Sequence, residues 1–138
     1  MTPAAVTLRD MNRMVETHGV RVLTVEPEVA TLGSEDDAVE LIGQAFGEEA
    51  GVVVVPVARV DERFFALRTR VAGDVVRKFA AYRIRLVVLG DLGTHLESES
   101  FRAFVHEINK GTDIWFLPDR AALDERLRTV AETLGRSR

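Results

Sequence analysis

The stretch Gly51-Val52-Val53-Val54-Val55-Pro56 decides the fold of this chain. Its β-branched residues form an unbroken apolar run, which is typical of a strand covered on both faces, as in a parallel sheet. Proline has no N–H to donate to a neighbouring strand, so we expect Pro56 to lie at the end of this strand. The run therefore predicts a layered α/β arrangement in which helices join parallel strands.

Three further segments have the pattern of strands. Val20–Glu26 alternates apolar and polar residues, as a half-buried strand does, and Pro27 ends it. Ile84–Leu89 and Ile114–Leu117 are mostly apolar, and turn residues follow each of them.

Apolar residues recur at helical spacing between these strands and after the last one. Ser34 precedes three acidic residues and has the features of an N-cap, and Gly47 is a typical helix stop. A short turn through Phe64 and Phe65 precedes a longer helix that begins near Thr69. The predicted buried faces are Ala38, Leu41, Ile42, Ala45 and Phe46; Ala72, Val75, Phe79 and Tyr82; Phe101, Phe104, Val105 and Ile108; and Leu123, Leu127, Val130 and Leu134.

This alternation of strands and helices predicts a single α/β domain over residues 19–135. We expect a mostly parallel sheet of four to five strands, covered by helices and joined by right-handed crossovers. Residues 1–18 have the least regular pattern, and we expect them to form a frayed N-terminal extension.

Composition excludes several classes of protein. The chain is 46% apolar and 29% charged, which is globular composition, and the absence of cysteine excludes disulfides and thiolate metal sites. A net charge of −4 argues against nucleic-acid binding. The sequence shows no signal-peptide pattern and no apolar run long enough to span a bilayer, so we expect a cytoplasmic protein without a membrane partner.

A first candidate site is Arg68-Thr69-Arg70, at the predicted start of a helix. Free N–H groups and two arginines suit a phosphate or carboxylate there. In the alternative interpretation, Thr69 only caps the helix and the arginines are solvated.

Gly73 lies inside the same helix, where glycine costs about 1 kcal/mol relative to alanine. Close packing against the sheet, which we favour, or the approach of a ligand or partner would explain this glycine.

A second candidate is the loop Gly90–His95, in which Asp91 and His95 suit an acid–base pair or two metal ligands. A metal needs more ligands than these, and we expect neither a metal nor a cofactor. The sequence has no phosphate-binding loop, no nucleophile elbow and no zinc-protease motif. We therefore lean toward a function without catalysis, while an enzyme stays open.

Charge is unevenly placed along the chain. Residues 26–50 hold eight acidic side chains and no Lys or Arg, whereas residues 59–85 hold eight basic and three acidic ones. Two solvated helix faces would explain this asymmetry. The alternative is a pair of complementary patches for a protein partner or for self-association.

The middle of the chain also resembles a known family. The pattern is Asp61-x-x-Phe64-Phe65-x-Leu67-x-Thr69-x-x-Ala72-Gly73, then Lys78-Phe79, Tyr82-Arg83 and Gly90-Asp91. Ser98-x-Ser100-Phe101-Arg102-x-Phe104-Val105-x-Glu107-x-Asn109-x-Gly111 and Trp115-Phe116-Leu117 continue it. It resembles the bacterial family catalogued as domain of unknown function 4180, over about residues 19–134. This resemblance implies a bacterial protein and brings no assigned activity.

The predicted order of elements is similar to that of STAS domains, the fold of the anti-sigma-factor antagonists. In those regulators a Ser or Thr near the start of a helix is phosphorylated to control partner binding, and Thr69 lies at about that place. The usual Asp-Ser-Ser-Gly or Asp-Thr-Ser-Gly stretch is replaced here by Leu67-Arg68-Thr69-Arg70. By this similarity Thr69 is a candidate phosphoacceptor.

Two functions stay open at this point. The leading hypothesis is a non-enzymatic, STAS-like regulatory or protein-interaction domain that works through residues 64–73 and the loop Gly90–His95. The alternative is a protein or enzyme that binds a small anionic molecule at the carboxyl ends of the strands. In that case Arg68 and Arg70 would hold the anion, and Asp91 or His95 would handle a proton.

Overall fold

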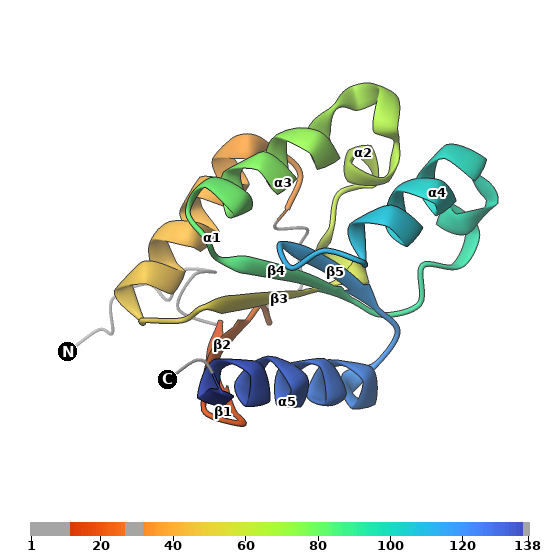
Figure 1. Ribbon diagram of the computed structural model, residues 1–138. Coiled ribbons are helices and arrows are strands. Elements are labelled where there is room, and N and C mark those ends of the chain that lie inside the picture. Colours follow the sequence, from red (N-terminus) through yellow and green to blue (C-terminus); the bar gives the residue numbers. More distant parts are fainter. Residues whose placement is uncertain (1–11, 27–31, 137–138) are drawn as a thin grey trace.

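A five-stranded sheet in the order β1-β2-β3-β4-β5 forms the middle layer of the computed structural model (Figure 1). The structure describes residues 12–26 and 32–136. Strands β2 to β5 are parallel to one another, and β1 is antiparallel to β2. The strands are β1 Arg13–Thr17, β2 Val20–Thr24, β3 Val52–Pro56, β4 Arg85–Leu89 and β5 Ile114–Leu117. The prediction of an α/β domain with a mostly parallel sheet is confirmed.

Strand β1 corrects the expectation of a frayed extension. Arg13–Thr17 pairs with β2 from Arg13 opposite Thr24 to Thr17 opposite Val20. The loop between the strands is His18-Gly19, and both residues have positive φ, 53° and 79°. A two-residue hairpin turn of this kind needs positive φ at both positions, and histidine is a weaker signal for it than asparagine or aspartate. Residues 1–11 of the predicted extension lie outside the described part of the chain.

Helices cover both faces of the sheet. They are α1 Glu35–Gly47, α2 Glu62–Phe65, α3 Val71–Ala81, α4 Glu99–Ile108 and α5 Arg120–Arg136, with short 3-10 helices η2 Val57–Arg59, η3 Leu67–Thr69 and η4 Gly93–Glu97. Because β2 to β5 follow in chain order and their crossovers share one hand, α1, α3 and α4 lie on the same face. Helix α5 follows the last strand and covers the other face (Figure 1).

The valines of β3 divide between two cores. Val53 and Val55 point into the larger core under α1, α3 and α4, where Phe64, Phe79 and Phe101 are fully buried. Val52 and Val54 point the other way, into the smaller core under α5. This alternation follows from the two-residue period of a strand. The unbroken valine run therefore predicted correctly that the strand is covered on both faces.

Two residues of the predicted buried faces are exposed instead. Phe46 is 56% exposed and Tyr82 is 47% exposed. Phe46 lies about 80° around the helix from Ala38, at about 100° per residue, and so sits at the margin of the apolar stripe. Tyr82 is the residue after α3 ends. Helical spacing alone therefore predicted apolar stripes that are wider than the buried faces of α1 and α3.

A side chain closes the outer edge of β5. Backbone N–H groups of Leu86 and Gly90 donate to the carbonyl oxygens of Asp113 and Leu117, so the odd-numbered residues of β5 face β4. The N–H and carbonyl groups of Phe116 therefore point away from β4, and the N–H donates to Asn109 Oδ1 at 2.7 Å. Asn109 Nδ2 donates in return to the Phe116 carbonyl at 3.0 Å. The amide of Asn109 thus takes the place of a neighbouring strand.

Candidate functional site

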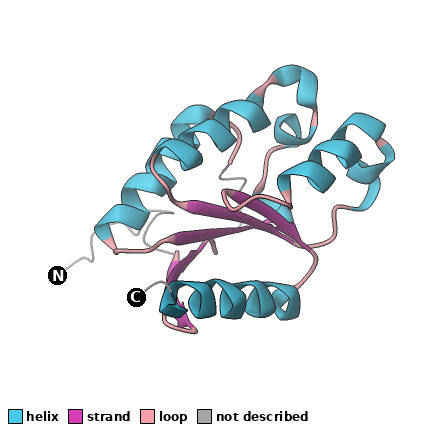
Figure 2. Cartoon of the chain, viewed as in Figure 1, coloured by secondary structure: helices cyan, strands magenta, loops and turns pink. Residues whose placement is uncertain are grey.

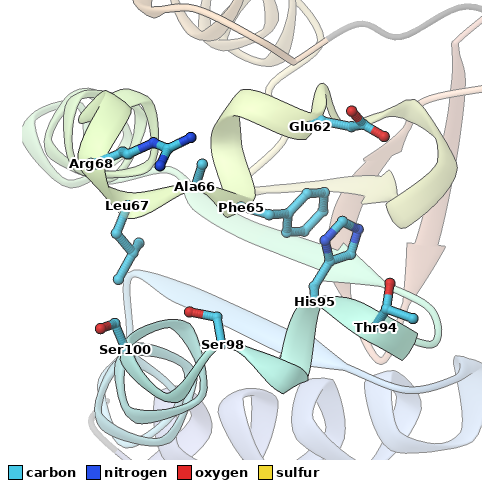
Figure 3. A pocket seen from close by; sticks show the side chains of 9 residues that line it. All are labelled: Glu62, Phe65, Ala66, Leu67, Arg68, Thr94, His95, Ser98 and Ser100. Carbon is cyan, nitrogen blue, oxygen red and sulfur yellow. The ribbon is translucent and has the colours of Figure 1, made fainter.

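An open groove lies beyond the carboxyl ends of β3 and β4, on the face covered by α3 and α4. The loops that build it follow these two strands (Figure 2). Its volume is about 580 Å³. Figure 3 shows the α2–η3 segment on one side and the η4–α4 segment on the other. The lining residues are Glu62, Phe65, Ala66, Leu67, Arg68, Thr94, His95, Ser98 and Ser100.

Asp61 begins the first wall as the N-cap of α2. Its carboxylate accepts hydrogen bonds from the N–H and Nε of Arg63, at 2.9 and 3.1 Å. The backbone bond from Arg63 is the main reason why the pKa of Asp61 lies below its usual value. Gly33 packs against this cap, since a Cβ at Gly33 would lie 2.7 Å from Asp61 Cβ. The wall is therefore anchored to the segment that leads into α1.

Thr69 ties η3 to the wall through its hydroxyl. The hydroxyl lies 2.6 Å from the Arg63 carbonyl oxygen and 2.7 Å from that of Ala66, to which it donates, and it accepts from Val71 N–H at 3.3 Å. The N–H groups of Thr69 and Arg70 bond to Ala66 and Leu67. The N–H groups of Thr69, Arg70 and Val71 are therefore already hydrogen-bonded within this segment.

His95 builds the second wall by stacking on Phe65. The two rings are nearly parallel, 14° apart, with centroids 3.8 Å apart. Phe101 of α4 meets Phe65 edge-on at 5.5 Å, below the stack. Ser98 is the N-cap of α4 and its Oγ accepts from Phe101 N–H at 3.2 Å. Two distant chain segments therefore meet in one stack, in which the partly exposed ring of His95 covers the buried ring of Phe65, beside serine hydroxyls (Figure 3).

The loop before His95 has a structural role. Gly90 has a φ of 135°, and a Cβ there would lie 3.2 Å from Val57 Cγ2, so this turn requires glycine. The Asp91 carboxylate accepts from Gly93 N–H at 2.8 Å and closes the turn. The structure shows no hydrogen bond between Asp91 and His95. The hypothesis of an acid–base pair therefore has no support from their geometry.

The structure brings together only part of the predicted site. Arg68 and His95 both line the groove, whereas Arg70, Gly73 and Asp91 are not among its lining residues. Gly73 is exposed, and a Cβ there would meet no atom within 4 Å, so close packing against the sheet is not the reason for this glycine. Within residues 12–26 and 32–136, nothing in the fold accounts for it.

The sequence patterns did not indicate three of the lining residues as site residues: Glu62, Ser98 and Ser100. Ser98 carries a usable signal, because an N-cap serine at the end of a loop after a strand lies near the site edge of such a sheet. Glu62 and Ser100 have no local signal, since only the approach of α2 to α4 places them in one groove. No group of three or more metal-ligating side chains occurs in the described part of the chain.

A family model described as Domain of unknown function (DUF4180) matches residues 17–127. No curated protein and no solved structure matches the chain. The similarity to STAS domains stays a prediction. Over the described ranges, no helix has the length and apolar character needed to cross a membrane.

Proposed function

This chain belongs to the DUF4180 family, and we propose that it is a protein-interaction domain whose groove binds an acidic, extended segment of a partner protein. One observation carries the proposal. A cationic side chain, Arg68, and the stacked plate of Phe65 and His95 line the same open groove. The groove thus combines an anion-binding group with an apolar surface.

Arg68 supplies the charge. Its guanidinium is exposed and makes no hydrogen bond or ion pair with any residue that the structure describes. Guanidinium groups bind carboxylates in a bidentate manner, which favours an Asp or Glu of the partner. Glu62, on the same wall of the groove as Arg68, would repel a second acidic residue and so orient the segment.

The aromatic plate and the hydroxyls supply the rest of the surface. The ring of His95, held in place by its stack on the buried Phe65, offers a surface against which an apolar side chain or a peptide plane packs. Thr94, Ser98 and Ser100 add hydroxyl groups at the rim, which suit the backbone of a bound peptide. Peptide recognition commonly combines polar contacts to the main chain with a pocket for one side chain.

The polar groups nearest the groove favour binding over catalysis. Ser98 Oγ is engaged by Phe101 N–H, and the Asp91 carboxylate closes its own turn. His95 has no hydrogen-bonded acid or nucleophile among the described residues. A catalytic histidine needs such a partner within hydrogen-bond reach.

An unbiased display library of short peptides tests the proposal. We expect selection on the wild-type protein to enrich peptides that contain Asp or Glu. Arg68→Glu should abolish binding of the selected peptides, while Arg70→Glu, an equal change of charge outside the groove lining, should keep most of it. Selected peptides that bind Arg68→Glu as tightly as the wild type would refute the assignment of the groove.

The groove volume favours a small anionic molecule as the second candidate. About 580 Å³ lies within the range of small-molecule sites. Arg68 would then hold the anionic group, and His95 would stack on the ligand or move a proton. A thermal-shift screen with anionic metabolites separates the two functions, because a tight ligand raises the Tm by mass action. A hit lost in Arg68→Glu, without any peptide binding, would favour the small molecule.

A further inference from the structure

Two exposed aromatic rings meet where α1 and α3 lie side by side on one face of the sheet (Figure 1). Phe46 and Tyr82 pack edge-to-face with their centroids 5.9 Å apart, and each keeps about half of its surface exposed. An ion pair between Lys78 and Glu35 crosses between the same two helices. The described chain thus leaves an apolar surface uncovered at this junction.

Val39 and Gly43 extend this surface along α1. Val39 is 44% exposed and lies seven residues before Phe46, on the same side of the helix. Gly43 lies between them, is exposed, and would have no atom within 4 Å of an added Cβ. Glycine inside a helix costs about 1 kcal/mol relative to alanine. The result is a hollow between two apolar side chains, which suits a projecting side chain of an opposing surface.

The two helices carry opposite charges. Helix α1 holds four acidic side chains and no Lys or Arg, and Glu48 and Glu49 follow it. Helix α3 holds two basic side chains and one acidic one, and Arg83 lies just beyond it. A twofold axis parallel to the helices would place α1 of one copy opposite α3 of the other, so that acidic and basic surfaces meet. An axis across the helices would instead place α1 opposite α1, with like charges facing. The charge pattern therefore favours one arrangement of a symmetric pair.

We propose that this α1–α3 face, formed by Val39, Gly43, Phe46 and Tyr82, binds a second copy of the chain. Both apolar helix faces are covered in such a dimer, and the hollow at Gly43 receives a side chain of the partner copy. Glu48 lies two residues after Phe46, and Arg83 lies directly after Tyr82, so this arrangement brings the two charges together across the interface. The groove is lined by other segments, and both copies keep it open.

Analytical ultracentrifugation of the full chain, from about 1 to 300 µM, measures the association. We expect a reversible dimer whose Kd rises about tenfold or more in Phe46→Ser, since exposed aromatic anchors carry much of the energy of an interface. Val15→Ser, which changes another exposed apolar residue, on the edge strand β1, should leave the Kd unchanged. A monomer at every concentration overturns the proposal, as does a dimer that Val15→Ser disrupts and Phe46→Ser does not.

A charge exchange tests the arrangement of the two copies. Glu48→Lys and Arg83→Glu should each raise the Kd, and the double variant should restore it toward the wild-type value. The dimer should also weaken with added salt. A double variant that associates more weakly than either single variant overturns the placement of α1 against α3. Circular dichroism of each variant confirms that the fold is unchanged.

Discussion

Replacement of Asn109 by alanine tests the role of this side chain at the edge of the sheet. The change removes two hydrogen bonds to the backbone of Phe116, at 2.7 and 3.0 Å. Phe116 is 4% exposed, so its N–H and carbonyl group have little access to water. The variant therefore leaves a donor and an acceptor without partners in a nearly buried strand.

The expected loss of stability follows from these two bonds. Each contributes about 1 kcal/mol net, and a buried group left unpaired costs more, so we expect a loss of about 2 to 4 kcal/mol. With an unfolding entropy of about 2.1 cal/mol/K per residue, the lower figure corresponds to a decrease in Tm of about 7 °C for this chain. Lys110→Ala, at the exposed neighbouring position, should change stability by less than about 0.5 kcal/mol.

Urea unfolding followed by the fluorescence of Trp115 measures this loss. Trp115 is the single tryptophan and is 2% exposed, so its emission reports the folded state. Asn109→Asp should be at least as destabilising as alanine at neutral pH, because a carboxylate then faces the Phe116 carbonyl oxygen. An alanine variant within about 0.5 kcal/mol of the wild type would contradict this prediction, since water would then satisfy the backbone groups of Phe116 equally well.

Changes at four other residues test local features of the structure. Gly73→Ala should raise the free energy of unfolding by about 0.5 to 1 kcal/mol in urea unfolding, since the added methyl group has room, whereas Gly90→Ala should lower it because φ is 135° there. Thr69→Val should cost about 1 to 2 kcal/mol by thermal unfolding and Thr69→Ser much less, because serine keeps the hydroxyl; equal losses would contradict this role. The pKa of Asp61 is lower in the folded protein than in the unfolded chain, where it is about 3.9. The carboxylate of Asp61 therefore stabilises the fold above about pH 3.9, and this stabilisation is lost as the pH falls through the lower pKa of the folded state. Asp61→Asn keeps a capping side chain, so its urea midpoint should fall less steeply below about pH 4 than that of the wild type, and parallel pH profiles would contradict the prediction.

Two of the nine lining residues, Arg68 and His95, were named as candidates from the sequence. Arg68 flanks a predicted helix start, and His95 lies in a loop after an apolar strand, where ligands usually bind at the edge of a parallel sheet. The sequence did not show which of the candidate residues line the groove and which lie beside it. Arg70 and Arg68 are two residues apart and look alike in the sequence, yet only Arg68 lines the groove. That difference depends on the turn that Thr69 stabilises and on the left-handed backbone of Arg70, with a φ of 65°.

The layered α/β fold follows from the sequence alone, because the valine run of β3 and the helical spacing of apolar residues are local patterns that burial imposes directly. The edges of the sheet and the surfaces of the domain depend instead on tertiary contacts. Strand β1, the amide of Asn109 on β5 and the stack of His95 on Phe65 all depend on how segments distant in the chain approach one another. Such contacts produce no periodic pattern of residues in the sequence, because each is made by a single side chain or a single turn.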